Sequence, residues 1–191
     1  MYTDLATLTQ DVLGCQKCPL SQGRLHAVPG DGDPHAKLLF IGEGPGKNED
    51  MEGRPFVGAA GKFLAEMLGT IGLTREDVFI ANIVKCRPPN NRDPLPVEIE
   101  ACSPYLDDQI RLINPQMIVT LGRYSMWHFL PGLKISLTHG QPKKRQSDGR
   151  VILPLYHPAA ALYNGSMRSV LIQDFSKIPA ILEAITQSES V

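Results

Sequence analysis

The 191-residue sequence lacks any apolar run that approaches the roughly 20 residues of a membrane-spanning helix. Its first residues, "MYTDLATLTQDVLG", are polar and amphipathic, without the apolar core of a signal peptide. These two absences argue against a membrane protein or an exported protein. We therefore expect a cytoplasmic location and no membrane partner.

A large net charge is also missing, because 19 basic and 20 acidic residues leave a formal charge of −1. The total charge therefore indicates no polyanionic partner. Basic residues nevertheless gather in "KCRPPNNR" (85–92) and "KKRQSDGR" (143–150). A local basic stripe can bind nucleic acid even when the total charge is near zero. Either stretch taken alone is more typical of a solvated loop.

The composition, 42% hydrophobic and 20% charged, is typical of a globular protein with a core. Four short apolar runs bounded by turn residues predict buried strands at 37–42, 78–84, 116–122 and 150–156. Helical patterns cover 3–13, 63–71, 96–113 with an interruption or kink near Pro104, 122–130, and 169–185 with a break at Pro179. This alternation predicts an α/β fold whose mostly parallel sheet is covered on both faces. Since no repeat or linker is visible, we expect a single domain over 1–191.

Three unusual loops follow predicted strands. They are "GEGPGKNEDMEGRPFVGAAG" (42–61), "KCRPPNNRDP" (85–94) and "HPAAALYNGSMR" (157–168). Ligands of open α/β sheets bind beyond the carboxyl ends of the strands. We therefore expect the three loops to meet at one edge of the sheet and to form the functional site.

The four cysteines are Cys15, Cys18, Cys86 and Cys102. Without an export signal, a disulfide framework is not expected. A thioredoxin-like pair would open a helix after a strand, whereas this Cys-x-x-Cys follows a helix. Four thiolates complete the ligand set of zinc or of an iron–sulfur cluster, and the spacing does not choose between them. The alternative is two buried structural cysteines plus a chance pair. With all four ligand positions used, such a metal site is structural and clamps the N-terminal segment to the loop after the second strand.

Five motifs occur in order over nearly the whole chain: "CQKCPL" (15–20), "GEGPG" (42–46), "GRPFVGAAG" (53–61), "NIVKCRPPNNRDP" (82–94) and "HPAAAL" (157–162). Together they resemble the family 4 uracil-DNA glycosylases, the iron–sulfur type. The resemblance implies a three-layer α/β/α sandwich around a four-stranded, mostly parallel sheet. It also implies a [4Fe–4S] cluster on Cys15, Cys18, Cys86 and Cys102 in place of zinc. The implied activity is monofunctional hydrolysis of the uracil N-glycosidic bond in single- or double-stranded DNA, by a monomer.

Such an enzyme must extrude the nucleotide to reach the bond it breaks. Phe56 matches the residue that stacks on the extruded base. The Asn82 amide offers an acceptor and a donor that match N3–H and O4 of uracil, whereas cytosine presents the reverse pattern. His157 would donate a hydrogen bond to uracil O2 and stabilise the departing anion. The alternatives for these residues are a core phenylalanine, an asparagine bonded to nearby backbone, and a structural histidine.

The glycine motif supplies further candidates. Gly42, Gly44 and Gly46 would let backbone N–H groups approach the uracil. In family 1 enzymes the matching motif carries an aspartate that positions water, and here Gly44 stands at that position. The water is then positioned by Glu43, by a backbone carbonyl, or by hardly any group of the protein. Gly46 stands where those enzymes have the tyrosine that excludes thymine, so exclusion is expected from elsewhere, through Glu49.

DNA contacts are expected from two groups of residues. Leu162 and Tyr163 would fill the space that the extruded base leaves. Candidate phosphate contacts are Lys85, Arg87, Arg92, Lys143, Lys144, Arg145 and Arg168.

Two other functions fit parts of the sequence. A non-catalytic DNA-binding protein with a structural four-cysteine metal site is the main alternative, and the presence of Phe56, Asn82 and His157 argues against it. A zinc-stabilised nucleotide hydrolase is disfavoured because "GEGPGKNED" lacks the Walker spacing. The sequence does not indicate a preference among U·G, U·A and single-stranded uracil, or activity on other deaminated bases.

Overall fold

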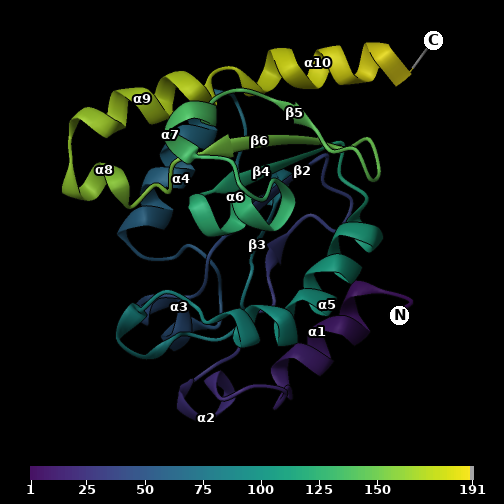
Figure 1. Cartoon of the computed structure of the whole chain (residues 1–191), viewed down its shortest axis with the longest axis vertical. Coiled ribbons are helices and arrows are strands. Elements are labelled where there is room, and N and C mark those ends of the chain that lie inside the picture. The colour runs from purple at the N-terminus through teal and green to yellow at the C-terminus, as the bar shows by residue number, and fades with distance from the viewer. Residues whose placement is uncertain (190–191) are drawn as a thin grey trace.

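The computed structural model describes residues 1–189 and contains a six-stranded sheet with the order β1-β3-β2-β4-β6-β5 (Figure 1). Its four central strands are mutually parallel and lie within the four predicted apolar runs. They are β2 (Leu38–Gly42), β3 (Phe79–Asn82), β4 (Met117–Leu121) and β6 (Val151–Leu155). The predicted α/β class and parallel core of the sheet are confirmed.

The expected number of four strands was too low, because a short antiparallel strand lies at each edge. β1 (Asp31–Gly32) pairs with β3, and β5 (Lys143–Lys144) pairs with β6. Neither strand has an apolar run that the sequence could reveal. Gly32 has φ +126°, and a Cβ there would meet the Val78 carbonyl oxygen at 1.9 Å, so β1 forms through close backbone approach. Short polar strands at both edges also limit unwanted pairing with other chains.

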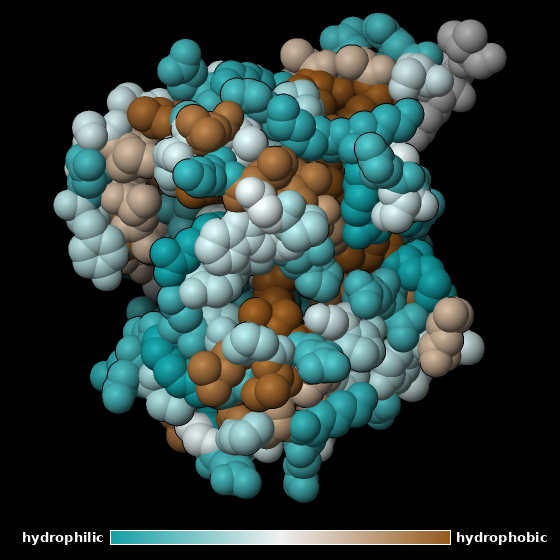
Figure 2. All heavy atoms as spheres, in the orientation of Figure 1, coloured by the Kyte–Doolittle hydropathy of each residue, from teal (hydrophilic) through white to brown (hydrophobic). Residues whose placement is uncertain are grey.

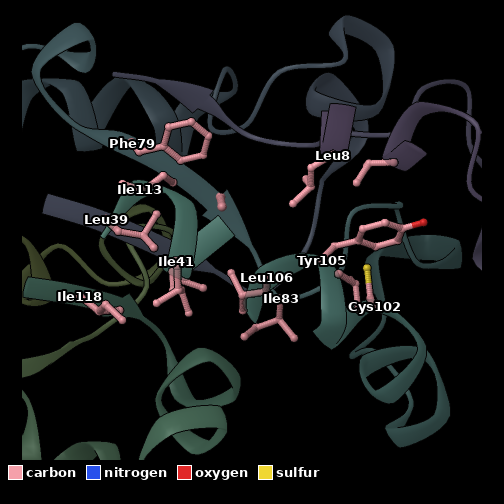
Figure 3. Close-up of a cluster of buried hydrophobic side chains, with 14 of the residues drawn as sticks. Leu8, Leu39, Ile41, Phe79, Ile83, Cys102, Tyr105, Leu106, Ile113 and Ile118 are labelled. Carbon is pink, nitrogen blue, oxygen red and sulfur yellow. The ribbon is translucent and has the colours of Figure 1, made fainter. Parts of the chain in front are cut away.

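The two faces of the sheet are each covered by a helical layer. Successive strand residues point to opposite faces, so Leu39 and Ile41 pack on one side and Leu38 and Phe40 on the other. The first side is covered by α1 (Leu5–Leu13) and α5 (Pro96–Ile113), whose buried side chains appear in Figure 3. The second side is covered by α4 (Ala59–Thr70) and α9 (Ser166–Phe175). The result is the expected three-layer sandwich.

Two predicted helix breaks differ from the structure. α5 runs without interruption through Pro104, because its buried face, including Cys102, Tyr105 and Leu106, packs along the core on both sides of that residue. The C-terminal helical pattern does divide, into α9 and α10 (Ile178–Glu189), but the break precedes Pro179. Proline is tolerated in the first turn of a helix, where its missing N–H needs no partner.

The remaining helices are short and lie mostly in the loops between strands. They are α2 (Leu20–Gly23), α3 (Lys47–Glu52), α6 (Arg123–Phe129), α7 (Ile135–Thr138), α8 (Ala160–Tyr163) and the 3-10 turns η1 (Arg75–Asp77) and η2 (Pro89–Asn91). Among the residues described, no helix has both the length and the apolar character needed to cross a membrane. Figure 2 shows a largely polar surface on this face, with apolar side chains gathered beneath α10.

Candidate active site

A pocket of about 170 Å³ opens at the carboxyl ends of the parallel strands. β2 ends at Gly42 and β3 ends at Asn82, and these two residues are in register. His157 follows the end of β6. The pocket brings together residues that are distant in sequence, and it is lined by Gly44, Gly46, Glu49, Phe56, Ala60, Asn82 and His157.

Gly42 lies behind this lining and must be glycine for steric reasons. A Cβ at Gly42 would stand 2.4 Å from Oδ1 of Asn82 and 2.8 Å from the Phe56 ring. Cβ atoms do not approach other heavy atoms that closely. Gly42 therefore allows the side chains of Asn82 and Phe56 to close together over the end of β2.

Phe56 is buried, with only 6% of its surface exposed, and forms one wall of the pocket. Its ring stacks against the His157 ring, with 5.5 Å between centroids and 26° between planes. The backbone of Phe56 is left-handed, with φ +52°. For a residue with a side chain this conformation costs on the order of 1–3 kcal/mol, so the surrounding contacts must impose it.

The Glu49 carboxylate holds the loop that carries Phe56. Oε1 accepts hydrogen bonds from the backbone N–H groups of Val57 and Gly58, both at 2.9 Å, and Oε2 accepts from Gly46 N–H at 3.1 Å. These bonds satisfy N–H groups at the starts of α3 and α4, where a negative charge is favourable. Glu49 thus fixes two glycine-rich turns while presenting a carboxylate at the pocket wall.

Asn82 is only 2% exposed, and its Oδ1 has no hydrogen-bond partner among the described residues. Such a buried unpaired acceptor is rare in folded proteins and suits a donor supplied by a ligand. The backbone carbonyl of Asn82 accepts from Nζ of Lys85 at 2.8 Å, and the same Nζ donates to Oε1 of Gln109 at 2.6 Å. The strand end that carries the amide is therefore tied to α5.

His157 has its tautomer set by the backbone. The N–H of Ala159 donates to Nδ1 of His157 at 3.1 Å, which makes Nδ1 the acceptor and places the ring proton on Nε2. The ring edge remains partly exposed in the pocket, yet burial lowers the pKa of His157 to about 4, against the opposing effect of the Glu49 charge. At neutral pH the site therefore contains a neutral imidazole with an N–H donor.

Glu43 is not among the residues that line the pocket. Its carboxyl group interacts with Asp93 and Arg123. Burial raises the pKa of Glu43 to about 7, with a further increase from the Asp93 charge and an opposing effect of Arg123. Its chain neighbour Gly44 does line the pocket.

The four cysteines come from three segments. Cys15 and Cys18 follow α1, Cys86 follows β3, and Cys102 lies on α5. Cys86 and Cys102 are buried, and Cys15 and Cys18 pack against the same core; Figure 3 shows Cys102 next to Tyr105 on α5. All four are free thiols. Burial raises the pKa of Cys102 to about 11 and also raises the pKa of Cys86, with smaller increases from the neighbouring cysteine charges. These mutual effects place the thiols within electrostatic range of one another.

Two N–H groups donate hydrogen bonds to these sulfur atoms. Nη1 of Arg24 lies 2.9 Å from Sγ of Cys86, and the backbone N–H of Lys85 lies 3.3 Å from Sγ of Cys102. Such bonds stabilise sulfur in its thiolate form. Within residues 1–189, no group of three or more His, Cys, Asp or Glu side chains is arranged to hold a metal ion. Four cysteines with N–H donors beside two of them fit a thiolate-ligated metal group in their chemistry.

Comparison with known proteins identifies the family. Residues 29–178 match the family model of the uracil DNA glycosylase superfamily. A type-4 uracil-DNA glycosylase of Sulfurisphaera tokodaii is 52% identical over 182 residues, covering 91% of this chain and 83% of the relative. The chain belongs to the type-4 uracil-DNA glycosylases. Similar relatives with the same name are found in Saccharolobus solfataricus (47% identity, 95% of this chain and 88% of the relative) and Thermotoga maritima (42%, 96% and 98%).

Among the residues expected to contact DNA, those on α8 lie at the pocket edge of the sheet. α8 begins three residues after His157, and it exposes half of Leu162 and 92% of Tyr163. Arg87 lies in the loop after β3 and is partly buried, with its Nε donating to Oδ1 of Asn91 at 2.8 Å. These residues lie on the loops that follow β3 and β6, at the same edge of the sheet as the pocket.

Several residues that were expected to contact phosphate lie away from the carboxyl ends of the parallel strands or in ion pairs. Lys143 and Lys144 pair with Ile152 and Val151 near the start of β6, at the opposite end of that strand from His157 (Figure 1). Neighbouring Arg145 is paired with Asp148. The composition of the basic run did not reveal this position in the sheet, and its contact with DNA stays a prediction. The surface proposed below for DNA is built on the residues nearer the pocket.

Three more cations from the same set are engaged in the fold. Lys85 is only 1% exposed, so the expectation that it contacts phosphate was wrong. Arg92 forms two hydrogen bonds with the buried Glu98 carboxylate at the start of α5, at 2.7 and 2.9 Å. Arg168 is paired with Glu66 and lies 4.4 Å from the centre of the Phe63 ring.

Three residues at or near the pocket were not expected from the sequence. Ala60 lines it, and the "GRPFVGAAG" motif already contained this residue. Arg75 donates to the backbone carbonyl of Phe56 at 2.8 Å, and Gln109 accepts from Lys85. Arg75 lies in an ordinary polar turn, and Gln109 in an amphipathic helix. Neither has a local signal that would connect it to the site.

Proposed function

We propose that this protein excises uracil from DNA by hydrolysing the bond between N1 of the base and C1′ of deoxyribose, leaving an abasic site. The observation that carries the proposal is the convergence of Phe56, Asn82 and His157 on one pocket, with Oδ1 of Asn82 buried and unpaired among the described residues. The names of the type-4 relatives support the same activity.

The Asn82 amide recognises the base edge. Its unpaired Oδ1 accepts from N3–H of uracil, and its NH2 group donates to O4. Cytosine would place an unprotonated N3 against Oδ1 and an amino group against the amide NH2. Both contacts are repulsive, and burial prevents water from replacing them. The bond from Lys85 Nζ to the Asn82 carbonyl supports this role by fixing the end of β3.

His157 stabilises the leaving group. As the C1′–N1 bond breaks, its electron pair moves onto the uracil ring and is shared with O2. The neutral imidazole of His157 donates Nε2–H to that oxygen, where the bond strengthens as negative charge develops. Water then adds to C1′ of the cationic sugar and loses a proton to solvent. The uracil anion takes up a proton from solvent, so that neutral uracil and an abasic site remain.

The walls of the pocket hold the base in place. Phe56 stacks on the extruded uracil with its ring already oriented by the contact with His157. Gly44 and Gly46 allow the base to approach the backbone closely. Glu49, whose carboxylate is fixed by three backbone N–H groups, forms the wall that excludes the methyl group of thymine.

We keep Glu43 as the candidate for positioning water, because it adjoins Gly44 and burial raises its pKa to about 7. A group that titrates near neutral pH can orient or deprotonate water. Its side chain is outside the pocket lining, so the role requires substrate and water to extend beyond the described pocket towards Asp93. An unchanged single-turnover rate of Glu43→Gln would remove it from the mechanism.

The thiols of Cys15, Cys18, Cys86 and Cys102 are the ligands of a [4Fe–4S] cluster. Zinc sites can use the same four thiolates, and the resemblance to the iron–sulfur glycosylases favours the cluster over zinc. Hydrogen bonds to Cys86 and Cys102 are typical of iron–sulfur ligands. When bound, the cluster supplies a cross-link between the N-terminal segment and the loop after β3.

DNA binds across the pocket edge of the sheet. The exposed Leu162 and Tyr163 fill the space left by the base, and Arg87 contacts the backbone. Arg92 and Arg168 form ion pairs with Glu98 and Glu66, and these carboxylates offset part of the positive charge offered to DNA. The proposed surface is thus modest in charge, in keeping with a net charge of −1.

The decisive experiment is incubation with a single-uracil oligonucleotide, followed by alkali to cleave at abasic sites. Strand cleavage that requires uracil, and that is lost in His157→Ala, supports the proposal. A protein that binds the oligonucleotide without forming abasic sites would instead be the non-catalytic DNA-binding protein with a structural four-cysteine site. The cofactor is tested separately by colour. An iron–sulfur cluster should make the protein brown, with an absorbance band at about 400 nm.

A further inference from the structure

Arg75 lies outside the pocket yet contacts the loop that carries Phe56. Its Nη1 donates to the Phe56 carbonyl oxygen at 2.8 Å, and its Nη2 donates to the Pro55 carbonyl oxygen at 2.7 Å. The side chain is only 18% exposed. One planar guanidinium thus binds two successive carbonyl groups, a geometry that lysine cannot reproduce with its single amine.

The contact occurs where the backbone is strained. Phe56 has a left-handed φ of +52°, which a residue with a side chain adopts only when its surroundings require it. Gly61 shows how close these surroundings are, since a Cβ there would stand 1.8 Å from the Phe56 carbonyl oxygen. The carbonyl of Phe56 is therefore held between the first turn of α4 and the guanidinium of Arg75.

Two opposite charges together satisfy the backbone of this loop. Glu49 accepts from the N–H groups of Val57 and Gly58, on the pocket side. Arg75 donates to the carbonyl groups of Pro55 and Phe56. Removal of Arg75 would free the two carbonyls to turn towards water, and the strain at Phe56 could then relax.

Arg75 is itself anchored at the edge of the sheet. Its Nη2 lies 3.5 Å from Oδ2 of Asp31, on β1, and Arg54 contacts the same oxygen at 2.8 Å. The two-residue strand β1 therefore has a role beyond pairing with β3, because it carries Asp31. It places a carboxylate within reach of both Arg75 and Arg54.

We propose that Arg75, oriented by Asp31, is a positioning residue for base excision, which holds the carbonyls of Pro55 and Phe56 so that the Phe56 ring stays in stacking position. The inference rests on the proposed function, because it assumes that an extruded base stacks on Phe56. Arg75 touches neither the base nor the sugar. It acts through Phe56 on the geometry in which the bond breaks.

The primary test compares Arg75→Met with Arg54→Met by single-turnover excision at saturating enzyme. Both variants remove one positive charge that contacts Asp31, but only Arg75 reaches the loop carbonyls. We expect Arg75→Met to slow excision on the order of tenfold to a hundredfold, since small displacements of reacting groups have effects of this size. Arg54→Met should remain within about twofold of the wild type, and Arg75→Lys should be intermediate.

A structural role is separated from a positioning role in two ways. Added guanidinium ion should partly restore the excision rate of Arg75→Ala, relative to an equal concentration of sodium chloride, because it can occupy the vacated site. In a double-mutant cycle, Arg75→Met should have little further effect in the Phe56→Ala background, because the ring that Arg75 positions is already gone. A general loss of stability would show neither behaviour.

The outcomes separate the two proposals. If the wild type excises uracil and Arg75→Met does so at a rate within about twofold, Arg75 has no positioning role. The same conclusion follows if the slow rate of Arg75→Met is additive with Phe56→Ala and guanidinium restores nothing. If the wild type excises no uracil, the proposed function fails and this inference fails with it. Should Arg75→Met not fold, Arg75→Lys in both backgrounds provides the same comparison.

Discussion

The backbone N–H of Ala159 donates a hydrogen bond to Nδ1 of His157 across 3.1 Å. This single contact leaves the proton of the neutral ring on Nε2, the nitrogen free to donate into the pocket. Burial lowers the pKa of His157 to about 4, so the ring is uncharged at neutral pH. The pocket therefore offers a hydrogen bond to a developing anion and not a full positive charge.

For His157→Ala we expect a loss of single-turnover excision on the order of a hundredfold to a thousandfold, as for removal of other oxyanion donors. Because the ring is neutral above about pH 4, its ionisation should add no step to the wild-type rate profile between pH 5 and 8. Rates measured across this range provide the test. A step near the ordinary value of 6.5 that vanishes in His157→Ala would show that the imidazolium is the active form.

Gly42→Ala should reduce excision by at least about tenfold, because the new methyl group would displace Asn82 and Phe56. Gly69→Ala is the matched control. Nothing lies within 4 Å of a Cβ at Gly69, and alanine favours the helix there by about 1 kcal/mol, so this variant should keep its activity and gain thermal stability. Equal activity of Gly42→Ala and the wild type would mean that the packing behind the pocket does not position the two side chains.

Glu43→Gln should change stability in a pH-dependent way. The pKa of Glu43 rises from an ordinary 4.5 to about 7 in the folded protein, so folding favours the protonated form. The stability that the folded protein gains by binding this proton is fully present below pH 4.5. It is lost as the pH rises through 7. Thermal unfolding of Glu43→Gln should therefore occur at a higher temperature than that of the wild type at pH 8, and the difference should shrink towards pH 4.5. A difference that grows at low pH would contradict this burial effect.

Lys85→Met should lower the rate of uracil excision by about tenfold or more. The protein should keep the absorbance at about 400 nm that indicates an iron–sulfur cluster. The variant loses the bond to the Asn82 carbonyl but no sulfur ligand. Lys17→Met removes an exposed cation between Cys15 and Cys18 and should leave excision unchanged. Loss of colour together with activity in Lys85→Met would assign Lys85 to the stability of the cluster and not to the position of Asn82.

Asn82→Asp should reduce uracil excision by at least about a hundredfold, since a carboxylate opposite O4 replaces a hydrogen-bond donor with a negative charge. The measurement compares excision of uracil and cytosine from otherwise identical oligonucleotides. The ratio of the two rates should fall, because the acceptor pair now suits the cytosine amino group. An unchanged ratio would move base recognition to other residues.

Much of this site could be anticipated because its motifs stand at strand ends. Phe56, Asn82 and His157 each occupy a loop or strand terminus in a pattern of alternating strands and helices, and parallel strands bring such ends to one edge. The position of Lys143 and Lys144 could not be anticipated in the same way. Their run is basic wherever it lies, and only its pairing with the start of β6 puts it far from the pocket.

The sequence alone determined the α/β class, the four parallel strands, the family, and the meeting of Phe56, Asn82 and His157, because hydrophobic periodicity and local motifs express these features directly. Tertiary structure alone decided which charges are free. It buried Lys85 beneath the Asn82 carbonyl, paired Arg92 with Glu98, partly buried Glu43 near Asp93, and placed Arg75 against the Phe56 carbonyl. Charge and hydrogen bonding act through space over a few ångströms, and those neighbours are set by the packing of segments far apart in the chain.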